Sequence, residues 1–114
     1  MIELGAGYVP SLCKRLDWIA EIWRKSEPEL AGQRRKPSEI LMEHVAFTSY
    51  VYEDVGDLTR QTDSRLYLFS SDYPHAEGGR QPLERFTKSL EGCGESAKDH
   101  FYSENFARVF AMRQ

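Results

Sequence analysis

The sequence predicts an α/β fold in which parallel strands alternate with helices. Three short runs of strand-forming residues are separated by segments with helical spacing, an order typical of βαβ units. The last run, residues 66–69, has no charged residue and ends abruptly, as expected for a strand of a parallel sheet that is covered on both faces. The chain has 114 residues, enough for one small domain.

The first predicted elements are a strand over residues 2–4, a flexible glycine turn over 5–7 and a helix over 10–24. Pro10 suits the first turn of that helix, where a backbone N–H has no helical partner. Apolar side chains at helical spacing make one face of the helix: Leu12, Leu16, Ile19, Ala20 and Trp23.

The middle of the chain is predicted to be a loop over residues 26–36, because Pro28 and Gly32 interrupt it. A short helix opens at residues 37–39 and ends near His44, and a second strand follows over 45–48. Residues 50–61 are expected to form a loop that leads into a helical turn.

The C-terminal part is predicted to be helical. A helix begins at Pro82 with Leu83, Phe86 and Leu90 on one face, and glycines after it relieve the strain of the helix end. Residues 95–101 form a short helix. The last helix starts at Ser103, and its expected buried positions are Phe106, Val109 and Phe110. Three strands leave two bare sheet edges, which native proteins normally cover.

Composition excludes several classes of protein. The net charge of −3 argues against a dedicated nucleic-acid binder, which usually carries a basic stripe. The cluster Arg34-Arg35-Lys36 is interpreted as a solvated loop, with phosphate contact as the alternative. Cys13 and Cys93 lack metal-site or redox spacing, so we expect reduced thiols in a cytoplasmic protein. No membrane partner and no signal peptide are expected, since no apolar run approaches about 18 residues.

Asp72 is the most informative residue for function. It ends the apolar run of residues 66–69 and is followed by Pro74, His75 and a glycine pair. In α/β folds, a carboxylate at the C-terminal end of a strand lies where catalytic groups and metal ligands are placed. The sequence therefore predicts Asp72 as a candidate site residue.

The segment Ser-Ser-Asp-Tyr-Pro-His at 70–75 resembles the last-strand motif of the amidohydrolase-related metal-dependent hydrolases and decarboxylases, the branch that includes aminocarboxymuconate-semialdehyde decarboxylase. Other segments resemble the same family in the right order. Residues 3–10, followed by Leu12, Arg15, Leu16 and Asp17, resemble the family's sixth strand and the helix after it. Residues 36–39 with His44-Val45 resemble the entry to the seventh strand. Residues 104–110 resemble the family's terminal helix. The resemblance covers nearly the whole chain.

Such proteins are (β/α)8 barrels of about 250 residues. The resemblance therefore implies that residues 1–114 are the C-terminal portion of a TIM (β/α)8 barrel, with about three βα units plus C-terminal helices. A missing N-terminal barrel segment, or self-association, would complete it. The family's metal-binding histidines would lie upstream of Met1, and the histidines present, His44, His75 and His100, lack the His-x-His spacing.

The resemblance also implies roles for individual residues. In the family, the aspartate after strand eight binds a divalent metal, Zn above all, and accepts a proton from the metal-bound water. Asp72 matches this position as metal ligand and catalytic residue, and its alternative is a loop carboxylate that caps the following turn. His75 would be a second catalytic or substrate-contacting residue, or an exposed loop histidine. Glu77 is expected at the surface, and Glu3 either faces the barrel mouth or is a surface charge.

Two further expectations concern neighbouring residues. Some decarboxylases of this group carry a histidine after strand six, where this chain has Gly5-Ala6-Gly7, so the decarboxylase reaction stays open. The aromatic residues Trp18, Trp23, Tyr50 and Tyr52 are predicted to pack in the core and between helices.

The functional expectation is the C-terminal part of a metal-dependent hydrolase or decarboxylase acting on a small carboxylate or amide-like substrate. The family is enzymatic, but this chain alone would supply an incomplete site and would not hold the metal, because such a site needs three or more protein ligands. The alternatives are a truncated, catalytically silent fragment that oligomerises, and a small binding module that uses the loop after Phe69.

Overall fold

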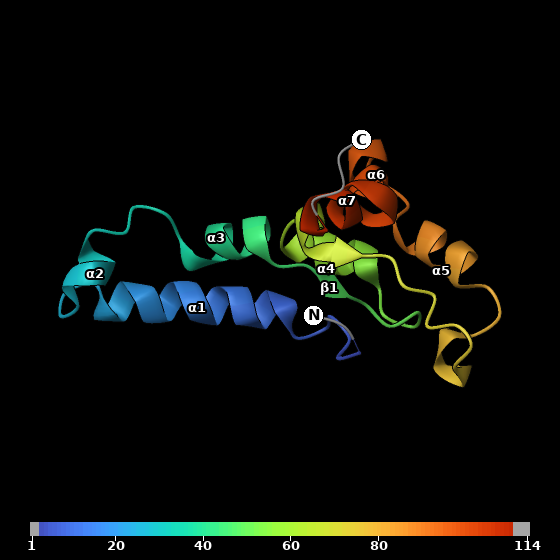
Figure 1. Cartoon of the computed structure of the whole chain (residues 1–114), viewed down its shortest axis with the longest axis horizontal. Helices are drawn as coiled ribbons and strands as arrows, with labels where there is room; N and C mark the ends of the chain where they lie inside the picture. The colour runs from blue at the N-terminus through green and yellow to red at the C-terminus, as the bar shows by residue number, and fades with distance from the viewer. Residues whose placement is uncertain (1–2, 111–114) are drawn as a thin grey trace.

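The computed structural model describes residues 3–110, which form a mostly helical α/β structure around one small sheet (Figure 1). The sheet has two parallel strands, β1 (Phe47–Thr48) and β2 (Tyr67–Leu68), with Phe47 opposite Tyr67 and Thr48 opposite Leu68. The molecule measures 51 × 30 × 27 Å, and α1 and α2 extend away from the sheet.

The described residues form the following helices, given in chain order. They are α1 (Val9–Trp23), α2 (Pro28–Ala31), α3 (Pro37–His44), α4 (Val55–Gln61), α5 (Pro82–Ser89), α6 (Glu95–Asp99) and α7 (Asn105–Val109). Short 3-10 turns span Ser64–Leu66 and Ala76–Gly78, and a π-helical segment, His100–Glu104, joins α6 to α7. None of the helices between residues 3 and 110 is long and apolar enough to cross a membrane.

The strand predictions hold for two of the three runs. The runs at 45–48 and 66–69 contain β1 and β2, and α4 connects them as the crossover of one βαβ unit. The strand predicted at 2–4 is not confirmed: Ile2 lies outside the described residues, and Glu3 has a φ of 62°, which breaks an extended backbone. The expectation of three βα units is therefore wrong for residues 3–110, which contain one parallel pair.

Most predicted helices are confirmed. The helix expected over 10–24 is α1, and those expected after Pro37, in 50–61 and after Pro82 are α3, α4 and α5. The loop expected over 26–36 contains the short α2, which begins at Pro28. The break expected between the last two helices is absent, because the π-helical segment continues the backbone from α6 into α7.

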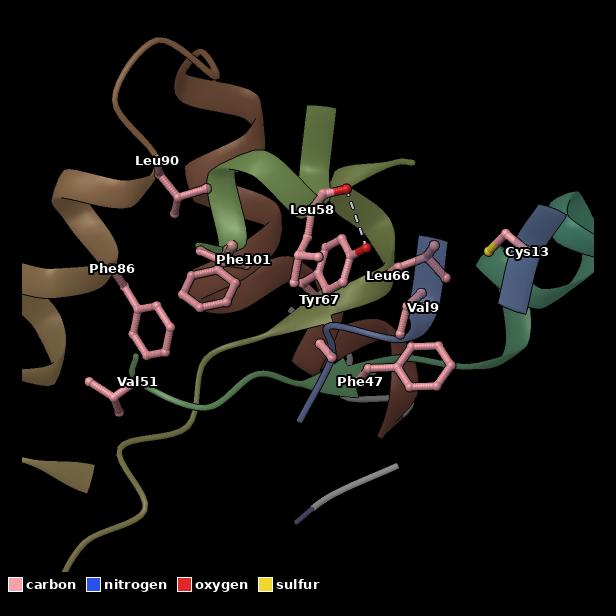
Figure 2. Close-up of a cluster of buried hydrophobic side chains, with 12 residues drawn as sticks. Val9, Cys13, Phe47, Val51, Leu58, Leu66, Tyr67, Phe86, Leu90 and Phe101 are labelled. Atoms are coloured by element: carbon pink, nitrogen blue, oxygen red, sulfur yellow. Dashed lines mark hydrogen bonds between the residues drawn. The ribbon is translucent and has the colours of Figure 1, made fainter. Parts of the chain in front are cut away.

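The core lies between the sheet, the N-terminal half of α1, α4, α5 and the C-terminal helices (Figure 2). Phe86 and Phe101 meet edge to face with ring centroids 4.9 Å apart, and Phe69 contacts both rings. Leu90 is fully buried beside Phe86, as its spacing predicts, but Leu83 is 59% exposed and does not share that face. Aromatic packing of this kind stabilises the contact beyond simple burial.

Tyr67 carries the main polar group inside this core. Its hydroxyl lies 2.7 Å from the Thr62 hydroxyl and donates to the Leu58 carbonyl at 3.3 Å (Figure 2). Burial raises the pKa of Tyr67 to about 12, since the phenolate would lose its hydration. The buried hydroxyl is thus satisfied in its neutral form.

The buried position of α7 is Asn105, not the aromatic residues. Phe106, Val109 and Phe110 are 47%, 40% and 60% exposed, so their predicted burial is wrong, whereas Asn105 is 1% exposed. Positions 101, 105 and 108 follow one another along one side of a helix, and this side faces the sheet. The Asn105 amide donates to the carbonyls of Ser64 at 2.8 Å and Tyr67 at 2.9 Å.

Arg108 extends this contact one turn further. Its guanidinium donates to the carbonyl of Glu43, at the end of α3, and to the carbonyl of Arg65, each at 2.7 Å. One polar side of α7 therefore ties together α3, the 3-10 turn and β2. The terminal-helix motif at 104–110 contains both residues that make these bonds.

Helix α1 exposes much of the apolar surface predicted to be buried. Trp18 and Trp23 are 63% and 51% exposed, and Tyr52 is 68% exposed, so the prediction that they pack in the core is wrong. For the two tryptophans the physical reason is that α1 extends beyond the sheet, where α2, α3 and the loop residues 34–36 are the described segments that lie along its C-terminal half (Figure 1). Asp17 holds α3 in place by accepting hydrogen bonds from the Ser38 N–H and hydroxyl.

Asp54 joins α4 to α5. Its carboxylate caps α4 by accepting from the Asp57 N–H at 2.9 Å, and it also accepts from the Ser89 hydroxyl at 2.8 Å. These hydrogen bonds lower the pKa of Asp54, the backbone bond contributing most. Gly56 lies at the same contact, where a Cβ would come within 1.8 Å of the Ser89 carbonyl.

We expect Asn105→Ala to lower the free energy of unfolding by about 2 kcal/mol, because the buried Tyr67 carbonyl loses a donor and the Ser64 carbonyl keeps only the Tyr67 N–H. Urea denaturation followed by far-UV circular dichroism measures this change. Ser103→Ala, on an exposed residue of the preceding turn, is the matched control and should shift stability by less than about 0.5 kcal/mol. Equal effects of the two substitutions would contradict the role of Asn105.

A second prediction concerns acid stability. Asp54→Ala removes the α4 cap and should destabilise the protein by about 1 kcal/mol at neutral pH. Because the folded pKa of Asp54 lies below the unfolded value of about 3.9, its contribution is present above that pH and is lost as pH falls through the folded pKa. The difference in unfolding free energy between wild type and Asp54→Ala should therefore shrink in acid. A difference independent of pH from 7 down to about 3 would contradict the charged cap.

Candidate active-site loop at the sheet edge

The carboxyl ends of β1 and β2 lie at the same edge of the sheet, because the strands are parallel. The loop after β1 carries Ser49, Tyr50 and Glu53, and the loop after β2 carries Asp72 and His75. This edge is where the sequence predicted the site.

The loop after β2 is anchored at Phe69, three residues before Asp72. The Phe69 N–H donates to the Phe101 carbonyl at 3.0 Å, and the Phe69 ring packs against Phe86 and Phe101. Asp72 itself has a φ of 54°, in the left-handed region that aspartate tolerates better than most residues. The peptide bond between Tyr73 and Pro74 is cis.

Asp72 and His75 are brought together, as expected for residues three positions apart on one turn. The His75 N–H donates to the Asp72 carbonyl at 2.8 Å, and His75 Nδ1 lies 3.1 Å from Asp72 Oδ1. The Asp72 side chain is 28% exposed and that of His75 is 63% exposed. The second carboxylate oxygen of Asp72 has no hydrogen bond to residues 3–110.

Gly78 allows the loop to fold back on itself. It is buried, and a Cβ there would lie 2.2 Å from the Ser71 carbonyl and 3.2 Å from the Asp72 carbonyl carbon. Only glycine lets the 3-10 turn Ala76–Gly78 pack so closely against the Asp72 backbone. Glu77, in the same turn, is exposed at the surface, as predicted.

Glu53 is a second carboxylate of this edge that the sequence reasoning missed. Its oxygens accept hydrogen bonds from the N–H groups of Ala6 (2.9 and 3.1 Å), Gly7 (2.8 Å) and Tyr50 (2.7 Å). This carboxylate therefore ties residues 5–7 to the loop after β1. Its position shortly after a predicted strand was the available signal, since that is where barrel-type folds place polar groups.

The glycines of Gly5-Ala6-Gly7 are explained by the same contact. Gly5 has a φ of 67°, and a Cβ there would lie 2.6 Å from the Tyr50 ring. The Tyr50 hydroxyl donates to the Glu3 carbonyl at 2.9 Å. Burial raises the pKa of Tyr50, and the negative charges of neighbouring groups add to this. Glu3 thus contributes its backbone to this edge, and its side chain is exposed.

Ser49, directly after β1, is buried, and 4% of its surface is exposed. Its hydroxyl has no hydrogen-bond partner among residues 3–110. A buried hydroxyl without a hydrogen bond lowers the stability of the fold unless a group outside residues 3–110 bonds to it.

The residues described do not fit a metal centre by themselves. No group of three or more His, Cys, Asp or Glu side chains between residues 3 and 110 could hold a metal ion, whereas such sites need at least three protein ligands. His100 is engaged elsewhere, with Nδ1 2.6 Å from the Ser64 hydroxyl and Nε2 3.3 Å from Glu104. His44 is exposed near the end of α3.

We expect Glu53→Gln to destabilise the protein by about 2 kcal/mol. The glutamine amide has one acceptor oxygen, whereas three backbone N–H groups donate to the two oxygens of Glu53. The substitution also removes the negative charge, which makes these hydrogen bonds stronger. Hydrogen exchange of the Ala6, Gly7 and Tyr50 amides measures the local effect, and exchange should accelerate at all three. Glu77→Gln, which changes the same charge on the exposed turn, is the control. Unchanged protection in Glu53→Gln would contradict the anchoring role.

Comparison with known proteins identifies similar proteins only among the solved structures. No family model matches the chain, and no curated protein matches it. Among solved structures, the crystal structure of amidohydrolase map2389c from Mycobacterium avium subsp. paratuberculosis K-10 matches with a TM-score of 0.71 and 30% sequence identity. The match covers 95% of this chain and 27% of that protein, so the chain spans about a quarter of the length of the protein it resembles. In sequence and in fold, this chain is related to the amidohydrolases and corresponds to part of one.

Proposed function

We propose that this chain is the C-terminal part of a metal-dependent hydrolase or decarboxylase of the amidohydrolase superfamily, built on a (β/α)8 barrel. Asp72 would be the carboxylate that the last strand contributes, as metal ligand and proton acceptor. The observation that carries this proposal is the position of Asp72: it follows β2 at the carboxyl edge of a parallel pair, in a chain related to the amidohydrolases.

The two carboxylates of the sheet edge are suited to different tasks. Both oxygens of Glu53 accept hydrogen bonds from backbone N–H groups, so Glu53 holds loops together. One oxygen of Asp72 contacts His75, and the other has no hydrogen bond to residues 3–110. A carboxylate with a free oxygen can accept a proton or a ligand bond, and this supports Asp72 over Glu53 as the reactive group.

His75 would position Asp72 rather than react itself. Its backbone N–H and its ring Nδ1 both contact Asp72, and its remaining nitrogen, Nε2, is directed away from that contact. A histidine with one nitrogen engaged and one free can also contact a small carboxylate or amide-like substrate. His75 is thus proposed as the neighbour that orients the Asp72 carboxylate.

The metal would need ligands from outside residues 3–110, since Asp72 and His75 are too few to hold it. This supports a site shared with another segment of an amidohydrolase fold, in which this chain supplies Asp72.

The alternative of a catalytically silent, associating fragment has its own support. Phe106 and Val109 of α7, with Phe110 directly after it, border a surface groove of about 260 Å³ beside Thr48 and Leu68, next to the sheet. Apolar residues exposed around a sheet in this way are typical of a surface that another segment covers. The two readings differ in whether the chain is active alone.

The test uses a chimera in which this chain replaces the matching segment of the related amidohydrolase. We expect Asp72→Asn in the chimera to lower kcat by about a hundredfold or more, the contribution typical of a positioned proton acceptor. Turnover of a panel of small carboxylates and amides, metal content and thermal unfolding are measured together. Glu77→Gln, with the same loss of charge five residues away, should leave all three unchanged.

Two outcomes decide between the readings. Unchanged turnover and metal content in Asp72→Asn would overturn the role proposed for Asp72. Clear turnover by the unmodified 114-residue chain with added Zn²⁺ or Mn²⁺ would overturn the silent-fragment reading.

A further inference from the structure

A surface groove lies between the loop after β1, α4 and α5. Its volume is about 490 Å³, within the range of pockets that hold small ligands. Tyr52, Arg60 and two cationic residues of α5 line the groove, whereas Asp72 and His75 do not. The groove is therefore separate from the carboxylate site described above, and a molecule bound there would be an additional ligand.

Three cationic side chains of the groove have hydrogen-bond donors left for a ligand. Arg85 and Lys88 are exposed, lie one helical turn apart on α5 and form no ion pair with residues 3–110. Arg60 is held in place, because Nη1 donates to Cys93 Sγ at 3.4 Å and Nη2 lies 4.0 Å from Asp54 Oδ1. A guanidinium has several N–H donors, so Arg60 also has donors to spare.

The acidic side chains of the groove are mostly engaged by donors of the protein. Both oxygens of Glu53 accept hydrogen bonds from backbone N–H groups, and Asp54 accepts from the Asp57 N–H and the Ser89 hydroxyl. These carboxylates therefore compete less for the three cations. Glu91 is the exception, since it lines the groove and forms no ion pair with residues 3–110.

The donors of the groove suit a phosphate group better than a carboxylate. A phosphate monoester carries a charge of about −1.5 to −2 and three acceptor oxygens, so it can bind all three cationic side chains at once. A carboxylate has one negative charge and two oxygens. Guanidinium groups also match the geometry of phosphate, with two parallel N–H donors to two oxygens.

Tyr52 adds an aromatic surface to the same groove. Its ring is stacked on Tyr50 with the centroids 5.3 Å apart and an angle of 14° between the planes. Tyr52 is nevertheless 68% exposed, so a second aromatic ring can stack on it from the groove. Nucleic-acid bases bind aromatic side chains in this way.

We propose that this groove binds a nucleoside monophosphate, with the phosphate at Arg60, Arg85 and Lys88 and the base stacked on Tyr52. The proposal goes beyond the function proposed for Asp72, because no residue of that site takes part.

The first test is a titration of the 114-residue chain with adenosine monophosphate, followed by NMR. The amides of Tyr52, Arg85 and Lys88 should shift and saturate, with a dissociation constant of about 1 mM or lower. Adenosine and inorganic phosphate are the two halves of this probe. Each should bind about tenfold or more weakly than the whole, because linking two groups makes the second contact intramolecular.

Charge variants test the phosphate contacts. Arg85→Gln and Lys88→Gln should each raise the dissociation constant of adenosine monophosphate about tenfold, as expected for a lost charge-assisted hydrogen bond. Glu91→Gln should lower it, because a negative charge beside the phosphate is removed. Lys25→Gln is the matched control, at the opposite end of the molecule from α5, and should leave the affinity unchanged (Figure 1). All four side chains are exposed, so thermal unfolding should stay the same.

Variants of Tyr52 test the base contact. Tyr52→Ser should weaken binding of adenosine monophosphate about fivefold or more and leave binding of inorganic phosphate unchanged, because the serine side chain has no ring on which a base can stack. Tyr52→Phe keeps the ring and should bind adenosine monophosphate like the wild type.

The proposal is overturned if adenosine monophosphate causes no saturable shifts, or if the shifts centre on residues 34–36 instead of the groove. It is also overturned if inorganic phosphate binds as tightly as adenosine monophosphate, or if the Arg85, Lys88 and Tyr52 variants bind like the wild type. These experiments measure binding and not turnover. Failure of this proposal is therefore distinct from failure of the role proposed for Asp72.

Discussion

The hydrogen bonds that the C-terminal helices make to β2 are the contacts on which the rest of the structure depends. A sheet of two short strands cannot satisfy its own backbone, and an unpaired buried carbonyl is costly. Asn105 supplies donors to Ser64 and Tyr67, and the Phe101 carbonyl accepts from Phe69. The strand that leads to Asp72 is thus held by residues more than thirty positions later in the chain.

The two loops at the sheet edge use this support differently. In the loop after β1, the Glu53 carboxylate accepts hydrogen bonds from the N–H groups of residues 6, 7 and 50 and so links this loop to residues 6 and 7. On the other side, the chain after Phe69 turns through a left-handed aspartate and folds back at Gly78. Both oxygens of the Glu53 carboxylate accept hydrogen bonds, whereas one oxygen of the Asp72 carboxylate has no hydrogen bond to residues 3–110.

Helix positions and the location of Asp72 after β2 were predictable from the sequence, because Pro10, Pro37 and Pro82 mark helix starts and the apolar run before Asp72 marks β2. Side-chain burial was less predictable. A period of 3.6 finds an apolar face but not what lies against it, so Trp23 and Phe110 were expected inside and lie outside. Asn105 and Glu53 were missed because their partners are backbone groups distant in sequence, which no local pattern reveals.

The left-handed backbone conformation of Asp72 determines which substitutions this position can accept during evolution. Asparagine and glycine are the residues that accept that conformation most readily, and both remove the charge. Since the Asp72 carboxylate makes one side-chain contact, to exposed His75, either replacement would leave folding nearly intact. Selection for a stable protein therefore does not preserve this aspartate, and its retention in a lineage reports selection on chemistry alone.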